Sequence, residues 1–241
     1  MKAIVTGHSK GLGAAIAAEL LGRGIPVLGL ARSHAPELAA RFPNLLSEVA
    51  LDLGDGAALA GWLAGPALGE YLAGSGTALL VNNAGVVSPI GPLHAQDPAA
   101  VLGAVTLNVG APLALAAALV RAGGATERRI VHISSGAARN AYPGWSVYCA
   151  TKAALDQHAR AVALDADPMV RACSLAPGVI DTGMQAEIRA APSQRFPMRE
   201  RFVQLKAGGA LTAPEDCARA LVDYLLAPGF GRTPVDDLRQ R

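Results

Sequence analysis

The chain has 241 residues, a length that suits one well-buried α/β domain and is short for two. Its 21 lysines and arginines and 19 aspartates and glutamates are scattered, and the formal net charge is +2. This composition argues against partners that need a basic stripe, such as nucleic acid or an anionic membrane, and favours a small-molecule partner.

Cysteine and histidine usage argues against a metal site and against disulfides. Cys149, Cys173 and Cys217 are widely spaced without a CxxC pair, and the five histidines form no ligand set. We therefore expect free thiols, no metal and a reducing compartment. The first residues lead straight into an apolar run that ends at Gly7, which leaves no room for a secretory segment, so the expected location is the cytoplasm.

Short apolar runs alternate with helical segments along the chain. KAIVTG precedes a helix from Leu12, IPVLGLA precedes one from about Pro36, and ALLVNNAG, RRIVHISS and VRACSLAPG each precede a further helix. Continuous apolar strands separated by helices indicate right-handed βαβ crossovers. The predicted fold is α/β, a doubly wound parallel sheet in a single domain over residues 1–241.

Residues 6–13, TGHSKGLG, follow the first predicted strand and open the first predicted helix. Glycines at positions 7, 11 and 13 let the backbone turn tightly and approach a pyrophosphate at the helix N-terminus. The spacing T-G-x-x-x-G-x-G differs from the commoner G-x-G-x-x-G, but the strand before it and the helix after it are the context that this mode of binding requires. The motif predicts a dinucleotide cofactor.

The second predicted strand ends at residues 30–32, where an NAD-selective enzyme usually offers an acidic side chain to the ribose 2′-hydroxyl. Arg32 stands there instead, and Lys10 lies in the glycine-rich loop. A guanidinium fork and a nearby ammonium suit a 2′-phosphate. The sequence therefore favours NADP(H) over NAD(H), with the alternative that both basic side chains are merely solvated.

The run PAAVLGAVTLNVGAPLALAAALV, residues 98–120, has no charged residue and is long enough to raise the question of a membrane span. Its centre holds Asn108, and helix-weakening residues interrupt it at Gly103, Gly110 and Pro112. We expect no membrane span, but a helix buried on most sides that could pack against another subunit.

Tyr148 and Lys152 lie in GWSVYCATKAALD, one turn apart on a predicted helix. About 6 Å of rise separates such positions on the same helix face, so a phenol and an ammonium there can act on one ligand. A packed tyrosine beside a snorkelling lysine is the alternative interpretation of the pair taken alone.

Together these motifs resemble the short-chain dehydrogenase/reductase family over nearly the whole chain. TGHSKGLG is similar to its cofactor loop, Asp52 and Leu53 to its adenine-contacting pair, and NNAG at residues 82–85 to the turn that supports the sheet. The resemblance implies a Rossmann fold, with a cofactor-binding half at about residues 1–130 and a catalytic and substrate-binding half at about 131–241. It implies NADP(H) contacts from Thr6, Gly7, Ser9, Lys10, Gly11, Leu12, Gly13, Arg32, Asp52, Leu53, Asn83, Ala84, Gly85, Tyr148, Lys152, Pro177, Gly178, Val179 and Thr182.

The resemblance also implies a catalytic set, Asn108, Ser135, Tyr148 and Lys152. Ser135 is preferred to Ser134 because it lies thirteen residues before Tyr148. Tyr148 would be the general acid for a substrate carbonyl, Ser135 would bind the same oxygen, and Lys152 would stabilise the phenolate. Asn108 would fix a water that relays protons to Lys152, and the hydride would come from the cofactor.

From Gly144 onward the chain is also similar to sepiapterin reductases and to bacterial reductases of benzil-type vicinal diketones, through GWSVYCATKAALD, APGVIDTGMQ, PMRERFVQLKAGGAL and TPVDD. The resemblance implies NADPH-dependent reduction of a ketone in a small vicinal dicarbonyl substrate. An aspartate near the C-terminus anchors the pterin in sepiapterin reductases, and Asp236 matches it, with an ordinary carboxylate on a loose tail as the alternative. The expected substrate-binding residues are Ser135, Trp145, Tyr148, Gly178, Met184 and Asp236. Phe196 and Met198 are further candidates, with plain packing in the core as the alternative.

Two rival functions stay open, a 3-oxoacyl thioester reductase and a non-catalytic NADP-sensing regulatory protein. Many bacterial members of the family close with V-D-G-G, whereas this chain closes with GRTPVDDLRQR, which weighs against the first rival and against the usual tetramer. Retention of all four catalytic residue types weighs against the second. The expected assembly is a homodimer through the long uncharged helix and the Tyr148 helix, with a tetramer as the alternative.

Overall fold

The computed structural model describes residues 1–241 and contains one seven-stranded parallel sheet in the order β3-β2-β1-β4-β5-β6-β7. Its strands are β1 (Lys2–Thr6), β2 (Val27–Ala31), β3 (Leu46–Ala50), β4 (Thr77–Asn82), β5 (Glu127–Ile133), β6 (Val170–Ala176) and β7 (Val235–Asp237). The chain winds outward from β1 in one direction and from β4 in the other, so the order reverses between these two strands. This reversal confirms the predicted doubly wound sheet, and a crevice at the carboxyl ends of the strands is expected there.

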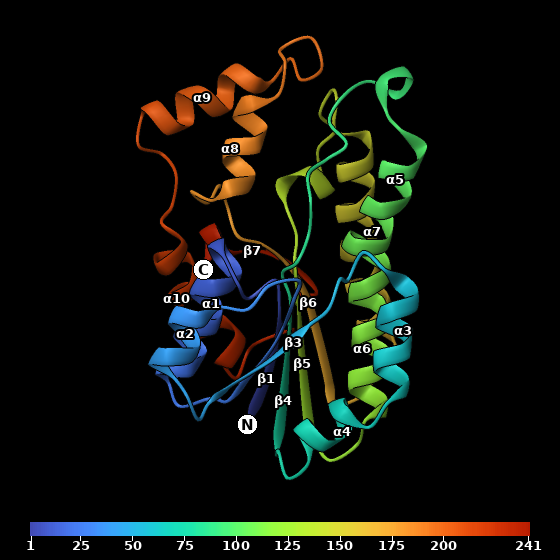
Figure 1. Ribbon diagram of the computed structural model, residues 1–241, viewed down its shortest axis with the longest axis vertical. Helices are drawn as coiled ribbons and strands as arrows, with labels where there is room; N and C mark the ends of the chain where they lie inside the picture. The colour runs from blue at the N-terminus through green and yellow to red at the C-terminus, as the bar shows by residue number, and fades with distance from the viewer.

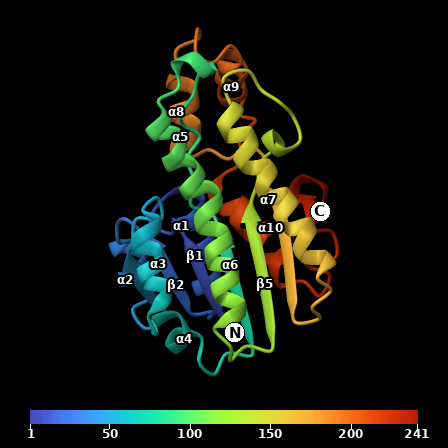
Figure 2. The same ribbon diagram turned by 90° about the vertical axis from the view of Figure 1, so that its right-hand side faces the viewer.

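Helices cover both faces of the sheet (Figures 1 and 2). One face carries α1 (Gly11–Gly22), α2 (Pro36–Arg41) and α10 (Pro214–Leu226), and the other carries α3 (Gly56–Ala64), α4 (Ala67–Leu72), α5 (Pro98–Val105), α6 (Ala111–Arg121) and α7 (Ser146–Leu164). A hydrophobic cluster of 25 buried residues fills the first layer and one of 16 fills the second. Both faces of the central strands are therefore withdrawn from water, which explains their continuous apolar sequences.

Two helices, α8 (Gly183–Ala190) and α9 (Arg199–Ala207), stand beyond the carboxyl ends of the strands, at the top of Figure 1. They lie at the same end of the molecule as α5 and the beginning of α7. Short 3₁₀ helices are η1 (Leu93–Ala95), η3 (Gly136–Ala138) and η4 (Leu238–Gln240). The chain segments that follow β5, β6 and β7 thus converge with α8 and α9 at one end of the sheet.

The long apolar run forms α5, a π-helical turn η2 (Thr106–Gly110) and α6. By length and composition alone, Pro98–Arg121 could cross a membrane, but α6 packs on the sheet through Leu115 and Leu119, each 1% exposed. Only a third of its most apolar stretch is buried, and Leu102 is 69% exposed, so the expectation of burial on most sides is not met within one chain. The run is a covering helix of this sheet with an apolar outer face.

Candidate active site

The glycine-rich loop between β1 and α1 is closed on itself. Gly7 and Gly11 have φ of +68° and +56°, a backbone conformation that side chains with a Cβ rarely adopt. A Cβ on Gly13 would lie 2.1 Å from the carbonyl oxygen of Gly7, so only glycine allows the start of α1 to come this close to the loop. The loop therefore presents bare backbone at the N-terminus of a 12-residue helix, where a phosphate is favoured.

Thr6 supports this loop from below. Its Oγ1 accepts hydrogen bonds from the backbone N–H groups of Asn83 and Ala84, each 2.9 Å long, and Asn83 Nδ2 donates to the Thr6 carbonyl at 2.9 Å. Thr6 thus joins the loop after β1 to the NNAG turn after β4, across the point where the strand order reverses. Its side chain does not line the cleft, so Thr6 positions the glycine-rich loop and the NNAG turn relative to each other.

A second link ties the glycine-rich loop to the segment after β2. His8 is 1% exposed, and its Nε2 lies 2.7 Å from Glu48 Oε1, which also accepts the Ala35 N–H at 2.7 Å. Burial opposes ionisation of Glu48, but the hydrogen bonds from His8 and Ala35 outweigh it and hold the pKa of Glu48 below its ordinary value. The His8 ring rests on β2, where a Cβ on Gly29 would lie 2.4 Å from it. Glu48 therefore fixes the loop that carries Lys10 relative to the segment that carries Arg32.

We predict that Glu48→Ala raises the KM for the dinucleotide cofactor expected from the sequence about fivefold and changes kcat less, because Lys10 and Arg32 lose their relative position while Tyr148 and Lys152 keep theirs. Steady-state kinetics with varied cofactor concentration measure this KM. The control is Glu37→Ala, which removes an exposed carboxylate from the nearby helix α2. Equal KM values for the two variants would contradict the positioning role of Glu48.

Lys10 and Arg32 line the same cleft at its end near β2, together with Ser33, Asp52 and Leu53. Neither basic side chain has a hydrogen bond or an ion pair with the protein. The Asp52 carboxylate is already used locally, because its Oδ1 accepts the Gly54 N–H at 2.8 Å. Two cations without protein partners therefore lie where the resemblance places the adenosine ribose.

Tyr148 and Lys152 extend from the first two turns of α7 into the cleft. The Lys152 ammonium nitrogen lies 5.7 Å from the centre of the Tyr148 ring and donates a 2.8 Å hydrogen bond to the carbonyl of Ile133, at the end of β5. Both side chains are buried, at 7% and 5% exposed. The position of the ammonium is therefore fixed by the sheet as well as by the helix.

Burial shifts both groups toward their neutral forms. It raises the pKa of Tyr148 to about 12, against the opposing effect of a hydrogen bond with the neighbouring Ser135 hydroxyl. It lowers the pKa of Lys152 to about 8, against the opposing effect of the Asp156 carboxylate. At neutral pH the phenol is thus a proton donor, and it stands beside an ammonium that is easily deprotonated.

The two adjacent serines after β5 have different surroundings. Ser134 Oγ donates a 2.7 Å hydrogen bond to the buried carboxylate of Asp156, which also accepts from Ser174 Oγ at 2.7 Å. Ser135 caps the 3₁₀ helix η3 and its Oγ accepts the Ala137 N–H at 3.1 Å, so its own proton can be donated to Tyr148 or to a ligand. Its position beside Tyr148 agrees with the choice of Ser135 from the spacing.

Asn108 sits in the π-helical turn η2, but its side chain does not line the cleft. Its Oδ1 accepts the Val86 N–H at 2.9 Å, and its Nδ2 donates to the Val86 carbonyl at 2.8 Å and to Thr151 Oγ1 at 3.2 Å. The side chain thus joins the loop after β4 to α7, one residue from Lys152. The side-chain amide is therefore a structural link, and the expectation that Asn108 fixes a water stays a prediction.

These groups open into one cleft of about 820 Å³ at the carboxyl ends of the strands. It is lined by most of the residues expected to bind cofactor or substrate: Gly7, Ser9, Lys10, Gly11, Leu12, Gly13, Arg32, Asp52, Leu53, Asn83, Ala84, Gly85, Ser135, Trp145, Tyr148, Lys152, Pro177, Gly178, Val179, Thr182 and Met184. A phosphate-binding loop therefore leads along one continuous hollow to a phenol, a hydroxyl and an ammonium. Thr6, Asn108 and Asp236 are the expected site residues that do not line it.

The family model described as short chain dehydrogenase matches residues 1–193. The chain belongs to the short-chain dehydrogenase/reductase family. Members of this family are oxidoreductases that use NAD(P). The glycine-rich loop and the Ser135, Tyr148 and Lys152 constellation both lie within the matched residues.

Curated relatives of this short-chain dehydrogenase include a benzil reductase ((S)-benzoin forming) from Bacillus cereus, 33% identical over 240 residues that cover 96% of each chain. A sepiapterin reductase from Meriones unguiculatus is 34% identical over 242 residues, which cover 94% of this chain and 92% of that one. Among solved structures, a short-chain dehydrogenase/reductase from Burkholderia vietnamiensis is 52% identical, with a TM-score of 0.73 over 99% of this chain and 96% of that one. The resemblance therefore extends over nearly the whole length.

Aromatic side chains form one wall of this dehydrogenase's cleft, beside Tyr148. Trp145 lines the cleft and stacks on Phe196 with 4.6 Å between ring centres, and its ring lies 5.3 Å from that of Tyr148. Phe196 and Met198 do not line the cleft, and Phe196 is completely buried behind Trp145. These two candidates are thus part of the packing that holds the indole in place, in a separate hydrophobic cluster of eight buried residues.

Asp236 is not where a substrate anchor would have to be. It lies in the edge strand β7 and is 7% exposed, and its carboxylate accepts hydrogen bonds from Tyr224 Oη at 2.8 Å and from Arg241 Nε at 2.8 Å. The Asp237 N–H adds a further hydrogen bond at 2.8 Å. Burial opposes ionisation, but the Arg241 guanidinium and the other donors hold the pKa of Asp236 below its usual value. The expectation for Asp236 is corrected accordingly, since its carboxylate is a structural group of the last strand.

Sequence reasoning missed several residues that do line the cleft, namely Tyr142, Arg201, Phe202 and Arg239. Tyr142 precedes α7, and Arg201 and Phe202 belong to α9. The basic stretch around Arg201 was visible in the sequence, but nothing local shows that it folds back over the strand ends. Arg239 lies three residues beyond Asp236, so the C-terminal segment reaches the cleft through a different residue from the one expected.

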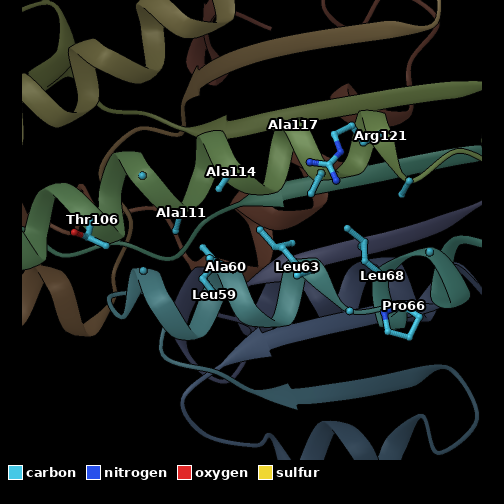
Figure 3. A pocket seen from close by; sticks show the side chains of 17 residues that line it. Leu59, Ala60, Leu63, Pro66, Leu68, Thr106, Ala111, Ala114, Ala117 and Arg121 are labelled. Atoms are coloured by element: carbon cyan, nitrogen blue, oxygen red, sulfur yellow. The ribbon is translucent and has the colours of Figure 1, made fainter.

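A second hollow of about 710 Å³ lies between α3 and α6 (Figure 3). It is lined mainly by alanines, glycines and leucines, and its polar side chains are Thr106 and Arg121. Figure 3 shows Leu59 and Leu63 of α3 facing Ala114 and Ala117 of α6. This groove contains no acid, base or nucleophile near a second polar group, so the chemistry belongs to the larger cleft.

Proposed function

We propose that this short-chain dehydrogenase uses NADPH to reduce one ketone of a small vicinal dicarbonyl compound to the alcohol. The observation that carries the proposal is the single cleft, which has Lys10 and Arg32 at one end and Ser135, Tyr148 and Lys152 at the other. A dinucleotide bound at the carboxyl ends of the strands reaches in the same way from a glycine-rich loop to the catalytic groups.

The residues fit a bound nicotinamide dinucleotide. The loop from Gly7 to Gly13 offers backbone close to the N-terminus of α1, and the segment from Pro177 to Thr182 lines the opposite wall. When bound, the nicotinamide supplies the hydride. The two unpaired cations, Lys10 and Arg32, suit a 2′-phosphate, which supports NADPH as the preferred form.

Side chains of the protein then bind and protonate the substrate oxygen. Ser135 donates its hydroxyl proton to the carbonyl oxygen, and Tyr148 donates its phenolic proton as that oxygen gains charge. Lys152, held by the Ile133 carbonyl, stabilises the phenolate that is left behind. The neutral phenol favoured by burial is the form that a reduction requires at neutral pH.

Aromatic contacts and the named relatives support an aromatic dicarbonyl as substrate. Trp145, Tyr142 and Phe202 line the cleft near Tyr148 and provide flat apolar surface. The relatives from Bacillus cereus and Meriones unguiculatus are named for benzil, a vicinal diketone, and for sepiapterin, whose side-chain ketone stands next to a carbon that bears a hydroxyl group. A benzil-type diketone is favoured over a pterin, because the carboxylate of Asp236 is not available to a pterin ring.

The test is the loss of NADPH absorbance with purified protein and three substrates: benzil, sepiapterin and an acetoacetyl thioester. The expected result is that the benzil reaction has the highest kcat/KM. Preference for the acetoacetyl thioester would replace the proposal with a 3-oxoacyl reductase. Cofactor binding without turnover of any of the three would favour an NADP-sensing regulatory protein.

Cofactor preference gives an independent prediction. The wild-type ratio of kcat/KM for NADPH over NADH should exceed ten, and Arg32→Ser should lower it about tenfold, because a charge-assisted bond to the 2′-phosphate is lost. Arg41→Ser, which removes an exposed arginine at the end of α2, is the matched control. A wild-type ratio near one would refute the assignment of NADPH.

We also propose a homodimer and a cytoplasmic location. The outer side of α5 and α6 carries the exposed apolar side chains Leu102, Val105 and Val120, at 69%, 43% and 37% exposed. Covering such a face with a second copy would remove apolar surface from water. Size-exclusion chromatography with light scattering measures the assembly, and the mass of a monomer would contradict the proposal.

A further inference from the structure

The C-terminal segment brings one side chain to the cleft, that of Arg239. It lies in η4, directly after β7, and lines the cleft together with Gly178, which follows β6. A Cβ on Gly178 would lie 3.3 Å from Arg239 Cδ and 3.5 Å from its Cγ, so the aliphatic part of the arginine runs close along the backbone there. Arg239 thus stands beside the segment that lines the cleft opposite the glycine-rich loop.

The Arg239 side chain is 63% exposed, and its guanidinium is paired with the Asp237 carboxylate. Asp237 accepts hydrogen bonds from its Nε at 2.9 Å and from its Nη2 at 2.5 Å, a planar two-point contact. The Asp237 side chain is only 7% exposed, and the Arg239 hydrogen bond holds the pKa of its carboxyl below the usual value. Arg239 Nη1 has no protein acceptor. One edge of the guanidinium is therefore fixed, and Nη1 is left for a ligand in the cleft.

The lining of the cleft includes other charged side chains besides Arg239. Arg201 of α9 also lines it, and so does Glu187, which accepts a hydrogen bond from Ser88. Arg139 nearby is already paired with Asp156, with 3.2 Å between Nε and Oδ2. Arg201 makes no side-chain hydrogen bond or ion pair with the protein, so of these two lining arginines Arg239 is the one that an ion pair orients.

We propose that Arg239 is a substrate-binding residue and that the preferred substrate is an aromatic 2-oxo acid, a vicinal dicarbonyl whose second carbonyl belongs to a carboxylate. The inference rests on the proposed function and narrows its substrate class. A guanidinium with a free Nη1 binds a carboxylate well, whereas it would face the donor groups on the guanidine-like edge of a pterin with like polarity. The aromatic ring of such a substrate would meet Trp145 and Tyr142, and its ketone would meet Tyr148.

The experiment compares benzoylformate, the anionic analogue, with benzil, the neutral one, in NADPH oxidation by wild type, Arg239→Gln, Arg239→Lys, Arg201→Gln and Arg219→Gln. Wild type should have the higher kcat/KM for benzoylformate, and Arg239→Gln should reduce the benzoylformate-to-benzil ratio about tenfold, mainly through KM. Arg239→Lys should restore part of the ratio. Arg219 lies on α10 in an exposed ion pair with Asp216, so Arg219→Gln should not change the ratio.

A binding measurement separates failure of this inference from failure of the proposed function. Calorimetry of benzoate with the enzyme and NADP⁺ should give about tenfold weaker binding for Arg239→Gln than for wild type, whether or not any dicarbonyl turns over. An unchanged substrate ratio together with unchanged benzoate affinity overturns the role of Arg239, even if benzil is reduced. A ratio that falls in Arg201→Gln and stays constant in Arg239→Gln overturns it as well.

Discussion

Replacing Tyr148 with phenylalanine should reduce kcat for ketone reduction about 100-fold to 10,000-fold and leave the affinity for NADPH nearly intact. Tyr148 is the group in the cleft that combines a buried hydroxyl, a neighbouring Ser135 and an ammonium 5.7 Å from its ring. Phenylalanine keeps the ring in contact with Trp145 and removes only the proton donor. Stopped-flow and steady-state measurements of NADPH oxidation, with fluorescence titration of NADPH, give both quantities.

The matched control is Tyr71→Phe. Tyr71 Oη lies 3.0 and 2.8 Å from the carbonyl oxygens of Ala3 and Pro26, which share its single proton, near the beginning of the sheet and outside the cleft. Its loss should affect stability and leave kcat within about twofold. Turnover of Tyr148→Phe within tenfold of wild type would remove Tyr148 from the role of general acid.

The sequence was sufficient for the central part of the sheet. β1, β2, β4, β5 and β6 have almost entirely buried sequences, and a continuous apolar run is the pattern that such strands leave. β3 and β7 were not predicted. β3, with the sequence LSEVA, is half exposed and contains Glu48, and β7 has three residues, so neither has an apolar run of its own.

The sequence predicted those parts of the site that a local motif forms. It could not predict those parts that form only when segments far apart in the chain come together. The glycine-rich loop and the Tyr148 helix each combine their signals within about a dozen residues. By contrast, Asp236 and Arg239 lie in one short stretch of sequence, and only the pairing of β7 with β6 decides which side chain faces the cleft. The His8 and Glu48 contact joins residues 40 positions apart and leaves no sequence signal either.

Replacing Lys152 with methionine should lower activity and raise the stability of the cofactor-free protein. Lys152→Met should reduce kcat at least 100-fold, because the phenolate of Tyr148 loses its neighbouring cation. In the folded protein burial lowers the pKa of Lys152 from 10.5 to about 8, so folding removes the ammonium from water at a cost. A shift of this size corresponds to about 3 kcal/mol of lost stability, since one pKa unit is about 1.4 kcal/mol.

The sign of the pH dependence follows from the direction of that shift. Below about pH 8 the lysine is charged in both the folded and the unfolded state, so the full cost is present, and it disappears as the pH rises from about 8 to 10.5. Methionine avoids this cost, but it leaves the Ile133 carbonyl without its 2.8 Å donor, and that loss destabilises the folded state by about 1 kcal/mol. Without cofactor, Lys152→Met should therefore be more stable than wild type by about 2 kcal/mol at pH 7, and the gain should shrink toward pH 10.

Urea unfolding of the cofactor-free proteins at pH 7 and pH 10 measures this difference. Lys206→Met is the control, because Lys206 is half exposed in an ion pair with Asp181 and its loss should change stability by less than about 1 kcal/mol. A Lys152→Met protein that is less stable than wild type at pH 7 would show that the ammonium is not destabilised by burial. The expected result would mean that the same burial serves function at the expense of folding stability. Burial of the Lys152 ammonium lowers the free energy of unfolding, but it also keeps the charge close to the developing phenolate and poorly screened by water.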